Sequence, residues 1–60
     1  MISTIPQDPV ILLSFINTRL RDNYPTLDAL CEDMDIDRSE LESRLNSIGY
    51  SYDSTINKFV

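Results

Sequence analysis

Apolar residues recur with the spacing of an α-helix over residues 9–22, and they cover an unusually wide part of the helix surface. On a helical wheel these side chains spread over roughly 200°, whereas a surface helix needs an apolar stripe of only about 100°. The apolar positions are Ile11, Leu12, Leu13, Phe15, Ile16 and Leu20, and the polar arc holds Ser14, Asn17, Thr18 and Arg21. The pattern predicts a helix that is covered on two sides.

Local signals mark both ends of this helix. Asp8 is a favourable N-cap, and Pro9 suits the first helical position because its missing N–H is not needed there. Pro25 disfavours helical torsion angles at Tyr24, so we expect the helix to end near Asp22.

Two shorter helices are predicted to follow. Thr26 is a suitable N-cap for a helix from Leu27 to about Met34, whose apolar residues form one narrow stripe. Asp37 and Glu40 form a variant of the capping box at the start of the third helix.

The third helix has further boundary signals. Ile36, just before the cap, is spaced to pack against Leu41 as a hydrophobic staple. Leu41, Leu45 and Ile48 mark its buried face, and Gly49 stands where a left-handed C-cap is expected.

The pattern changes after Gly49. Residues 50–52 and 56–60 are rich in aromatic and β-branched side chains and flank the polar turn 53–55, which predicts two short strands. The N-terminal segment 2–5 is a candidate third extended piece. Because a two-stranded ribbon is marginal in water, the tail has to lie on the helices or on another chain.

Together these elements predict one small, mainly α domain over residues 1–60. The expected fold is a three-helix, helix-turn-helix-like bundle with a short C-terminal β-ribbon. A chain of 60 residues buries a thin core, and small domains often compensate with a disulfide, a metal or a partner subunit.

The composition argues against catalysis and against cofactors. The chain has no His and a single Cys, so it offers neither a Ser/His or Cys/His arrangement nor a Cys/His zinc site. Its single Gly rules out a Gly-rich phosphate loop. Cys31 lies on the apolar stripe of the second helix, among acidic neighbours, and is expected to pack in the core.

Residues 33–37 place carboxylates as in the first half of an EF-hand loop, but the pattern then fails. Arg38 stands where the sharp turn needs Gly, and Arg44 stands where a bidentate Glu would bind Ca²⁺. A capped turn between two helices is the better interpretation, and no metal site is expected.

Charge is distributed unevenly. Residues 28–42 hold seven acidic side chains and one Arg, within a chain of net charge −5. A protein that grips duplex DNA normally presents a basic stripe, so the charge argues against DNA although the helix-turn-helix topology permits it. The apolar run 10–13 is far too short to cross a membrane, and no signal peptide is evident, so a cytoplasmic location is expected.

The wide apolar arc of the first helix, with the small size of the chain, predicts a homodimer. A symmetric partner would cover the side of the helix that carries Ile11 and Phe15; the alternative is that the tail of the same chain covers it. The candidate dimer or partner contacts are Ile11, Phe15, Arg19, Tyr50, Tyr52 and Phe59. For Tyr50 and Tyr52, packing on the helices is the competing interpretation.

Several stretches of the sequence carry a family resemblance. They are residues 5–14 (IPQDPVILLS), 17–22 (NTRLRD), 27–31 (LDALC) and 49–53 (GYSYD), with Asn57 and Phe59. In these stretches the chain resembles a family of short bacterial proteins of unknown function. The resemblance implies a self-contained bacterial protein and supplies no activity, ligand or catalytic residue.

Two functional classes follow from the sequence. The first is a small protein-interaction or regulatory module with an unknown protein partner, acting through its acidic face or its Tyr-bearing ribbon. The alternative is a DNA-binding transcriptional regulator of the helix-turn-helix type.

Overall fold

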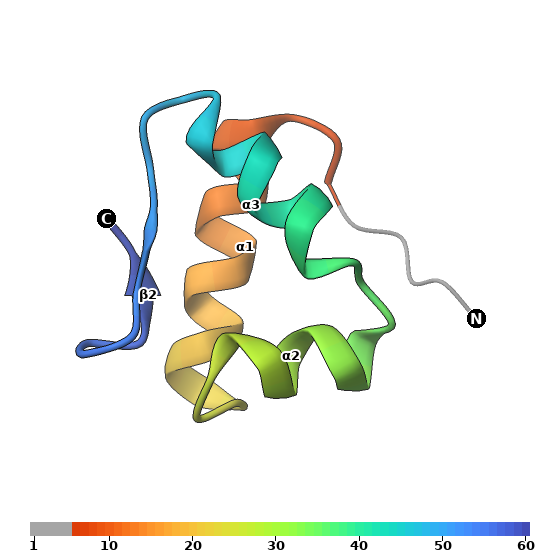
Figure 1. Cartoon of the computed structure of the whole chain (residues 1–60), viewed down its shortest axis with the longest axis vertical. Coiled ribbons are helices and arrows are strands. Elements are labelled where there is room, and N and C mark those ends of the chain that lie inside the picture. The colour runs from red at the N-terminus through yellow and green to blue at the C-terminus, as the bar shows by residue number, and fades with distance from the viewer. Residues whose placement is uncertain (1–5) are drawn as a thin grey trace.

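The fold consists of three helices and a C-terminal hairpin (Figure 1). It is seen in a computed structural model that describes residues 6–60. The elements are α1 (Pro9–Asp22), α2 (Leu27–Met34), α3 (Arg38–Asn46), β1 (Tyr52–Asp53) and β2 (Lys58–Phe59). The predicted mainly α bundle with a short C-terminal ribbon is confirmed. The predicted extended piece at residues 2–5 lies outside the described residues.

The three helices begin where their capping residues predict. Asp8 accepts a hydrogen bond from the Val10 backbone N–H at 2.9 Å, and Thr26 Oγ1 accepts one from the Ala29 N–H at 3.1 Å. At the start of α3, Asp37 Oδ1 accepts a hydrogen bond from the Ser39 N–H at 2.9 Å. Each cap satisfies a backbone donor that has no partner within the helix.

The capping box predicted at α3 is only half formed. Asp37 caps the helix, but the Glu40 carboxylate turns along the helix surface, where it accepts a hydrogen bond from Arg44. The competing cation, one turn away, offers a charge-assisted bond that a neutral backbone N–H cannot match.

α2 ends in a Schellman motif. The Ile36 N–H donates to the Cys31 carbonyl at 2.9 Å, and the Asp35 N–H donates to the Glu32 carbonyl at 3.4 Å. Asp35 holds the left-handed conformation that this motif requires, with φ of 58°. Ile36 then packs against the core.

The segment after α3 closes with the same motif. The Tyr50 N–H donates to the Leu45 carbonyl at 3.0 Å, and the Gly49 N–H donates to the Asn46 carbonyl at 2.9 Å. Gly49 has φ of 88°, so the predicted left-handed glycine is confirmed, one turn beyond the last α-helical residue.

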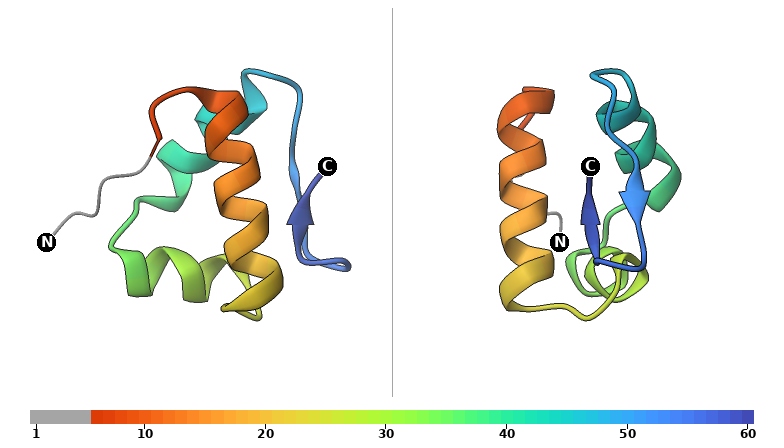
Figure 2. Two further views of the ribbon diagram at one scale, coloured as in Figure 1. Left: turned by 180° about the vertical axis from the view of Figure 1, so that it is seen from behind. Right: turned by 90° about the vertical axis from the view of Figure 1, so that its left-hand side faces the viewer.

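β1 and β2 form an antiparallel ribbon that lies along α1. Tyr52 pairs with Phe59 and Asp53 pairs with Lys58, and Ser51 and Val60 exchange two backbone hydrogen bonds of 2.9 Å. β2 lies between α1 and β1, while α2 runs across the end of α1 (Figure 2).

The core is formed by every element except β1, whose Tyr52 packs against its edge. Its buried residues are Leu12, Ile16, Leu20, Leu27, Leu30, Cys31, Leu41, Leu45 and Phe59. Phe15 is half-buried against this core, but Ile11 is 57% exposed. The ribbon contacts the Asn17 side of α1, so of the two covers considered for Ile11, the tail of residues 50–60 does not provide one.

Candidate functional site

Five of the six predicted contact residues fall into two groups. Ile11, Arg19 and Tyr50 are exposed, whereas Phe59 is 1% exposed and Tyr52 is half-buried against the core. The Phe59 and Tyr52 rings contact one another, with their centroids 5.6 Å apart. These two aromatic residues therefore hold the ribbon on the helices of their own chain.

Phe15 lies between the two groups. The Arg19 guanidinium covers the Phe15 ring at 5.3 Å from its centroid and donates a hydrogen bond to Asn23 Oδ1 at 3.3 Å. One flank of α1 thus carries Ile11, Phe15 and Arg19. The Phe15 ring is half-buried beneath the Arg19 guanidinium, so Ile11 is the exposed apolar side chain of this flank.

Asn17 attaches the ribbon to α1. Its side-chain Nδ2 donates to the Phe59 carbonyl at 3.1 Å, and its Oδ1 accepts from the Phe59 N–H at 2.8 Å. The amide therefore pairs with both backbone groups on the outer edge of β2, as a neighbouring strand would do. In the sequence, Asn17 falls in the polar arc of this helix, and only its position at the edge of that arc hints at this contact.

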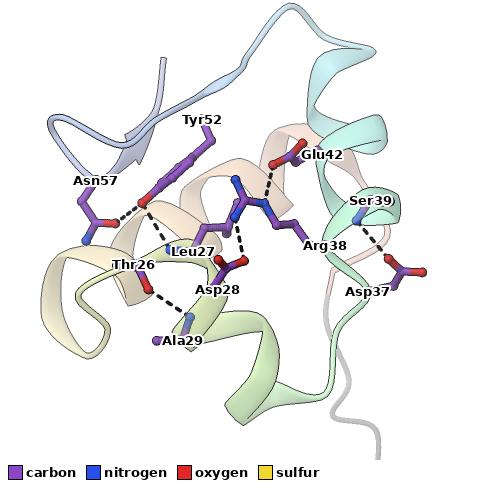
Figure 3. A network of polar contacts seen from close by, with 10 residues as sticks. All are labelled: Thr26, Leu27, Asp28, Ala29, Asp37, Arg38, Ser39, Glu42, Tyr52 and Asn57. Carbon is purple, nitrogen blue, oxygen red and sulfur yellow. Dashed lines mark hydrogen bonds and ion pairs between the residues drawn. The ribbon is translucent and has the colours of Figure 1, made fainter.

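Tyr52 and Asn57 connect the ribbon to the start of α2 (Figure 3). The Tyr52 hydroxyl accepts a hydrogen bond from the Leu27 N–H at 3.2 Å and donates one to Asn57 Oδ1 at 2.6 Å. Asn57 Nδ2 donates in turn to the carbonyls of Leu20 and Tyr24 at 3.1 and 3.0 Å. These bonds place the hairpin turn beside the C-terminal end of α1.

Arg38 joins α2, α3 and the ribbon. Its guanidinium forms ion pairs with Glu42 at 2.7 Å and Asp28 at 2.6 Å, and it lies 5.5 Å from the centroid of the Tyr52 ring (Figure 3). Hydrogen bonds to Glu42 and Asp28 raise the pKa of Arg38 above its usual value. Arg44, the other cation of α3, pairs with Glu40 at 3.4 Å.

Neither Cys31 nor Tyr24 is placed as a reactive group. Burial raises the pKa of the Cys31 thiol, and the Asp28 and Glu42 carboxylates add to this against the opposing Arg38. Tyr24 donates a hydrogen bond to Asp33 at 2.5 Å, which raises the pKa of the phenol. Both groups remain protonated near neutral pH, and Cys31 packs as the sequence predicts.

An open groove of about 750 Å³ runs between α1 and the hairpin turn. α1 lines it with Val10, Leu13, Ser14, Thr18 and Arg21, and the turn adds Ile56 and Lys58. Val10 and Ile56 are 63% and 53% exposed. Of the described residues that line the groove, two are charged, and both are cations. Its chemistry suits an apolar group that carries a negative charge.

Within residues 6–60, no three His, Cys, Asp or Glu side chains gather as a metal-ligand set. No helix in this part of the chain is long and apolar enough to cross a bilayer. The groove beside α1 and the neighbouring Ile11 flank expose apolar side chains that a partner could contact.

The arrangement defines a class of protein, a small three-helix domain closed by a C-terminal hairpin, with an exposed apolar helix face. Residues 6–59 match the model of a domain of unknown function, DUF4250, and the chain belongs to that family. The resemblance to a family of unknown function is confirmed to that extent. No curated protein and no solved structure matches the chain.

Proposed function

We propose that this protein is a non-catalytic protein-interaction module that assembles as a homodimer through the exposed face of α1. The observation that carries the proposal is the pair of large apolar side chains Val10 and Ile11, which are 63% and 57% exposed on a helix whose opposite side is buried. Ile56 is also exposed, at 53%, and lines the same groove towards the C-terminal end of α1. Adjacent exposed apolar residues are typical of contact surfaces.

The chemistry of the chain supports a role in binding over one in catalysis. It has no His, and its one thiol is buried and held protonated. General acid–base or nucleophilic catalysis needs a group whose pKa is adjusted toward neutrality and that can reach a substrate. A reduced, buried cysteine also suits the cytoplasm, which is the compartment we propose.

Sedimentation velocity tests the proposal. We expect the protein to sediment as a dimer at tens to hundreds of micromolar, and Ile11→Glu to shift it toward the monomer because the new carboxylate would be buried unpaired at the contact. Val60→Glu is the matched control, since Val60 is also exposed, at 52%, but lies on the ribbon. Circular dichroism checks that both variants fold. A monomer throughout this concentration range would refute the proposal.

One structural feature supports the DNA-binding alternative. α2 and α3 are joined by three residues, as in a helix-turn-helix. The charges oppose it, because each of the two cations of α3 lies beside carboxylates, whose negative charge offsets its attraction for phosphates. Fluorescence polarisation with a random duplex at low salt decides between the classes: binding that weakens steeply with salt would favour the regulator, and its absence favours the interaction module.

A further inference from the structure

The two ends of α1 carry opposite charges on the exposed surface. Asp8 caps the N-terminal end, and Arg21 lies in the last turn, where its side chain is 75% exposed. Asp8 accepts a hydrogen bond from the helix through Oδ1, and among residues 6–60 Oδ2 has no partner, so it can accept from a further cation. The exposed face of α1 is therefore acidic at one end and basic at the other.

The hairpin turn strengthens this asymmetry. Asn57 ties the turn to the carbonyls of Leu20 and Tyr24, so that Ile56 and Lys58 lie towards the C-terminal end of α1. This end of the groove thus offers an apolar side chain next to two cations. The N-terminal end of α1 offers the complementary set, with Val10 and Ile11 exposed beside Asp8.

The middle of the same face carries small side chains, which allow a second helix to pack closely. Ser14 and Thr18 are exposed and small, and they lie on the groove side of α1 between the apolar N-terminal end and Arg21. Small side chains at such a position let the axes of two helices come near each other.

We propose that the groove is occupied by α1 of a second copy of this chain, running antiparallel. In the register that brings Arg21 of one copy to Asp8 of the other, the two helices cross between Ser14 and Phe15, and Ile11 lies opposite Thr18 of the second copy. This arrangement is isologous, so each N-terminal end enters the cationic end of the other groove and the assembly closes at two chains. It rests on the proposed homodimer and gives that dimer its surface and direction.

The charges at the two ends of α1 favour the antiparallel over the parallel arrangement of the two helices. A parallel pair would place Arg21 of the second copy against Arg21 and Lys58, whereas the antiparallel pair places Asp8 there. Arg21 already pairs with Asp22 at 2.9 Å, but both side chains are exposed, and an exposed pair is weak enough to be shared with an intermolecular partner. The contact is about 20 Å long at 1.5 Å per residue, which places the dimer at the small and weak end of specific interfaces.

Mixed cysteine cross-linking tests the direction. Ile11→Cys and Thr18→Cys proteins are mixed in equal amounts at several hundred micromolar, oxidised and analysed by mass spectrometry. An antiparallel pair yields the mixed 11–18 disulfide well above its share in the roughly 1:2:1 mixture of 11–11, 11–18 and 18–18 products that random pairing gives. Ser39→Cys, on the exposed surface of α3, gives the background for random collision, and the wild type reports any reaction of the buried Cys31.

A pair of charge reversals tests the contact by a second route. Arg21→Glu brings a carboxylate to Asp8 of the second copy and is expected to raise the dimer dissociation constant about tenfold. Arg19→Glu changes the net charge equally but lies on the Phe15 flank, and it should change that constant less than threefold.

The outcomes separate the two proposals. Excess 11–18 product together with the Arg21 effect supports the antiparallel contact. A dimer by sedimentation that gives mainly 11–11 and 18–18 products, or no product above the Ser39→Cys background, overturns the antiparallel contact and leaves the homodimer standing. A monomer by sedimentation overturns both.

Discussion

Local hydrogen bonds hold the turn between α2 and α3, whereas long-range hydrogen bonds hold the ribbon on α1 and on the start of α2. In the first, the Asp35 turn and the Asp37 cap form hydrogen bonds within a few residues of the chain. In the second, Asn17 and Phe59 bond across 42 residues, and Tyr52 reaches Leu27 across 25.

This difference has a consequence for stability. A substitution in the local turn changes the free energy of unfolding only through the hydrogen bonds of that turn, because these bonds join residues close in the sequence. The ribbon junction places a core residue, supplies partners for the edge of β2 and bonds the first N–H of α2 at the same time. We therefore expect substitutions in the junction to affect the whole fold, and those in the turn to have small effects of either sign.

The largest effect is expected for Phe59→Ala. Removing a fully buried aromatic side chain costs about 3–5 kcal/mol, which is a large part of the stability of a domain this small. Thermal unfolding followed by circular dichroism should show a greatly lowered or lost transition. Ile48→Ala, at a half-buried apolar position after α3, serves as the control and should lose much less. Equal losses in the two variants would mean that the ribbon is no more than a surface attachment.

A smaller effect is expected for Asn17→Ala. The substitution leaves the Phe59 N–H and carbonyl without their partners and should lower the free energy of unfolding by about 1–3 kcal/mol in urea denaturation. Thr18→Ala, the next residue on the same helix, removes an exposed polar side chain and should change stability by less than about 0.5 kcal/mol. If Asn17→Ala were equally neutral, water would serve the β2 edge as well as the amide does.

The smallest effect, of opposite sign, is expected in the local turn. Asp35 holds a left-handed conformation, so Asp35→Gly should relieve its strain and raise the free energy of unfolding by about 0.5–1 kcal/mol. Glu32→Gly, inside α2, should instead lower it by about 1 kcal/mol because glycine disfavours the helix. A loss of stability in Asp35→Gly would show that its side chain contributes more to the turn than its backbone costs.

The difference between local and long-range contacts also explains which features the sequence could predict. Asp8, Thr26 and Asp37 mark the helix starts, and Gly49 marks the turn after α3, because caps depend on a few neighbouring residues. The hairpin was also predicted, since its alternation and polar turn are local.

Contacts between distant residues could not be predicted. Nothing in the pattern assigns Asn17 to the Phe59 backbone or Arg38 to both Asp28 and Glu42, because these pairs depend on how the helices pack. The tail leaves Ile11 exposed for the same reason: hydrophobic spacing shows which residues favour burial, but the direction of the ribbon decides which of them it covers.

The burial of Phe59 bears on the order of events during synthesis. Among the described residues the core begins with Leu12, yet the aromatic side chain that closes it is added 47 residues later, at position 59. Until the ribosome has delivered that residue, the emerging helices expose their apolar sides and lack the edge contact that Asn17 makes. Stable folding is therefore expected to follow translation of the hairpin, which makes the nascent chain most open to proteases and chaperones shortly before that point.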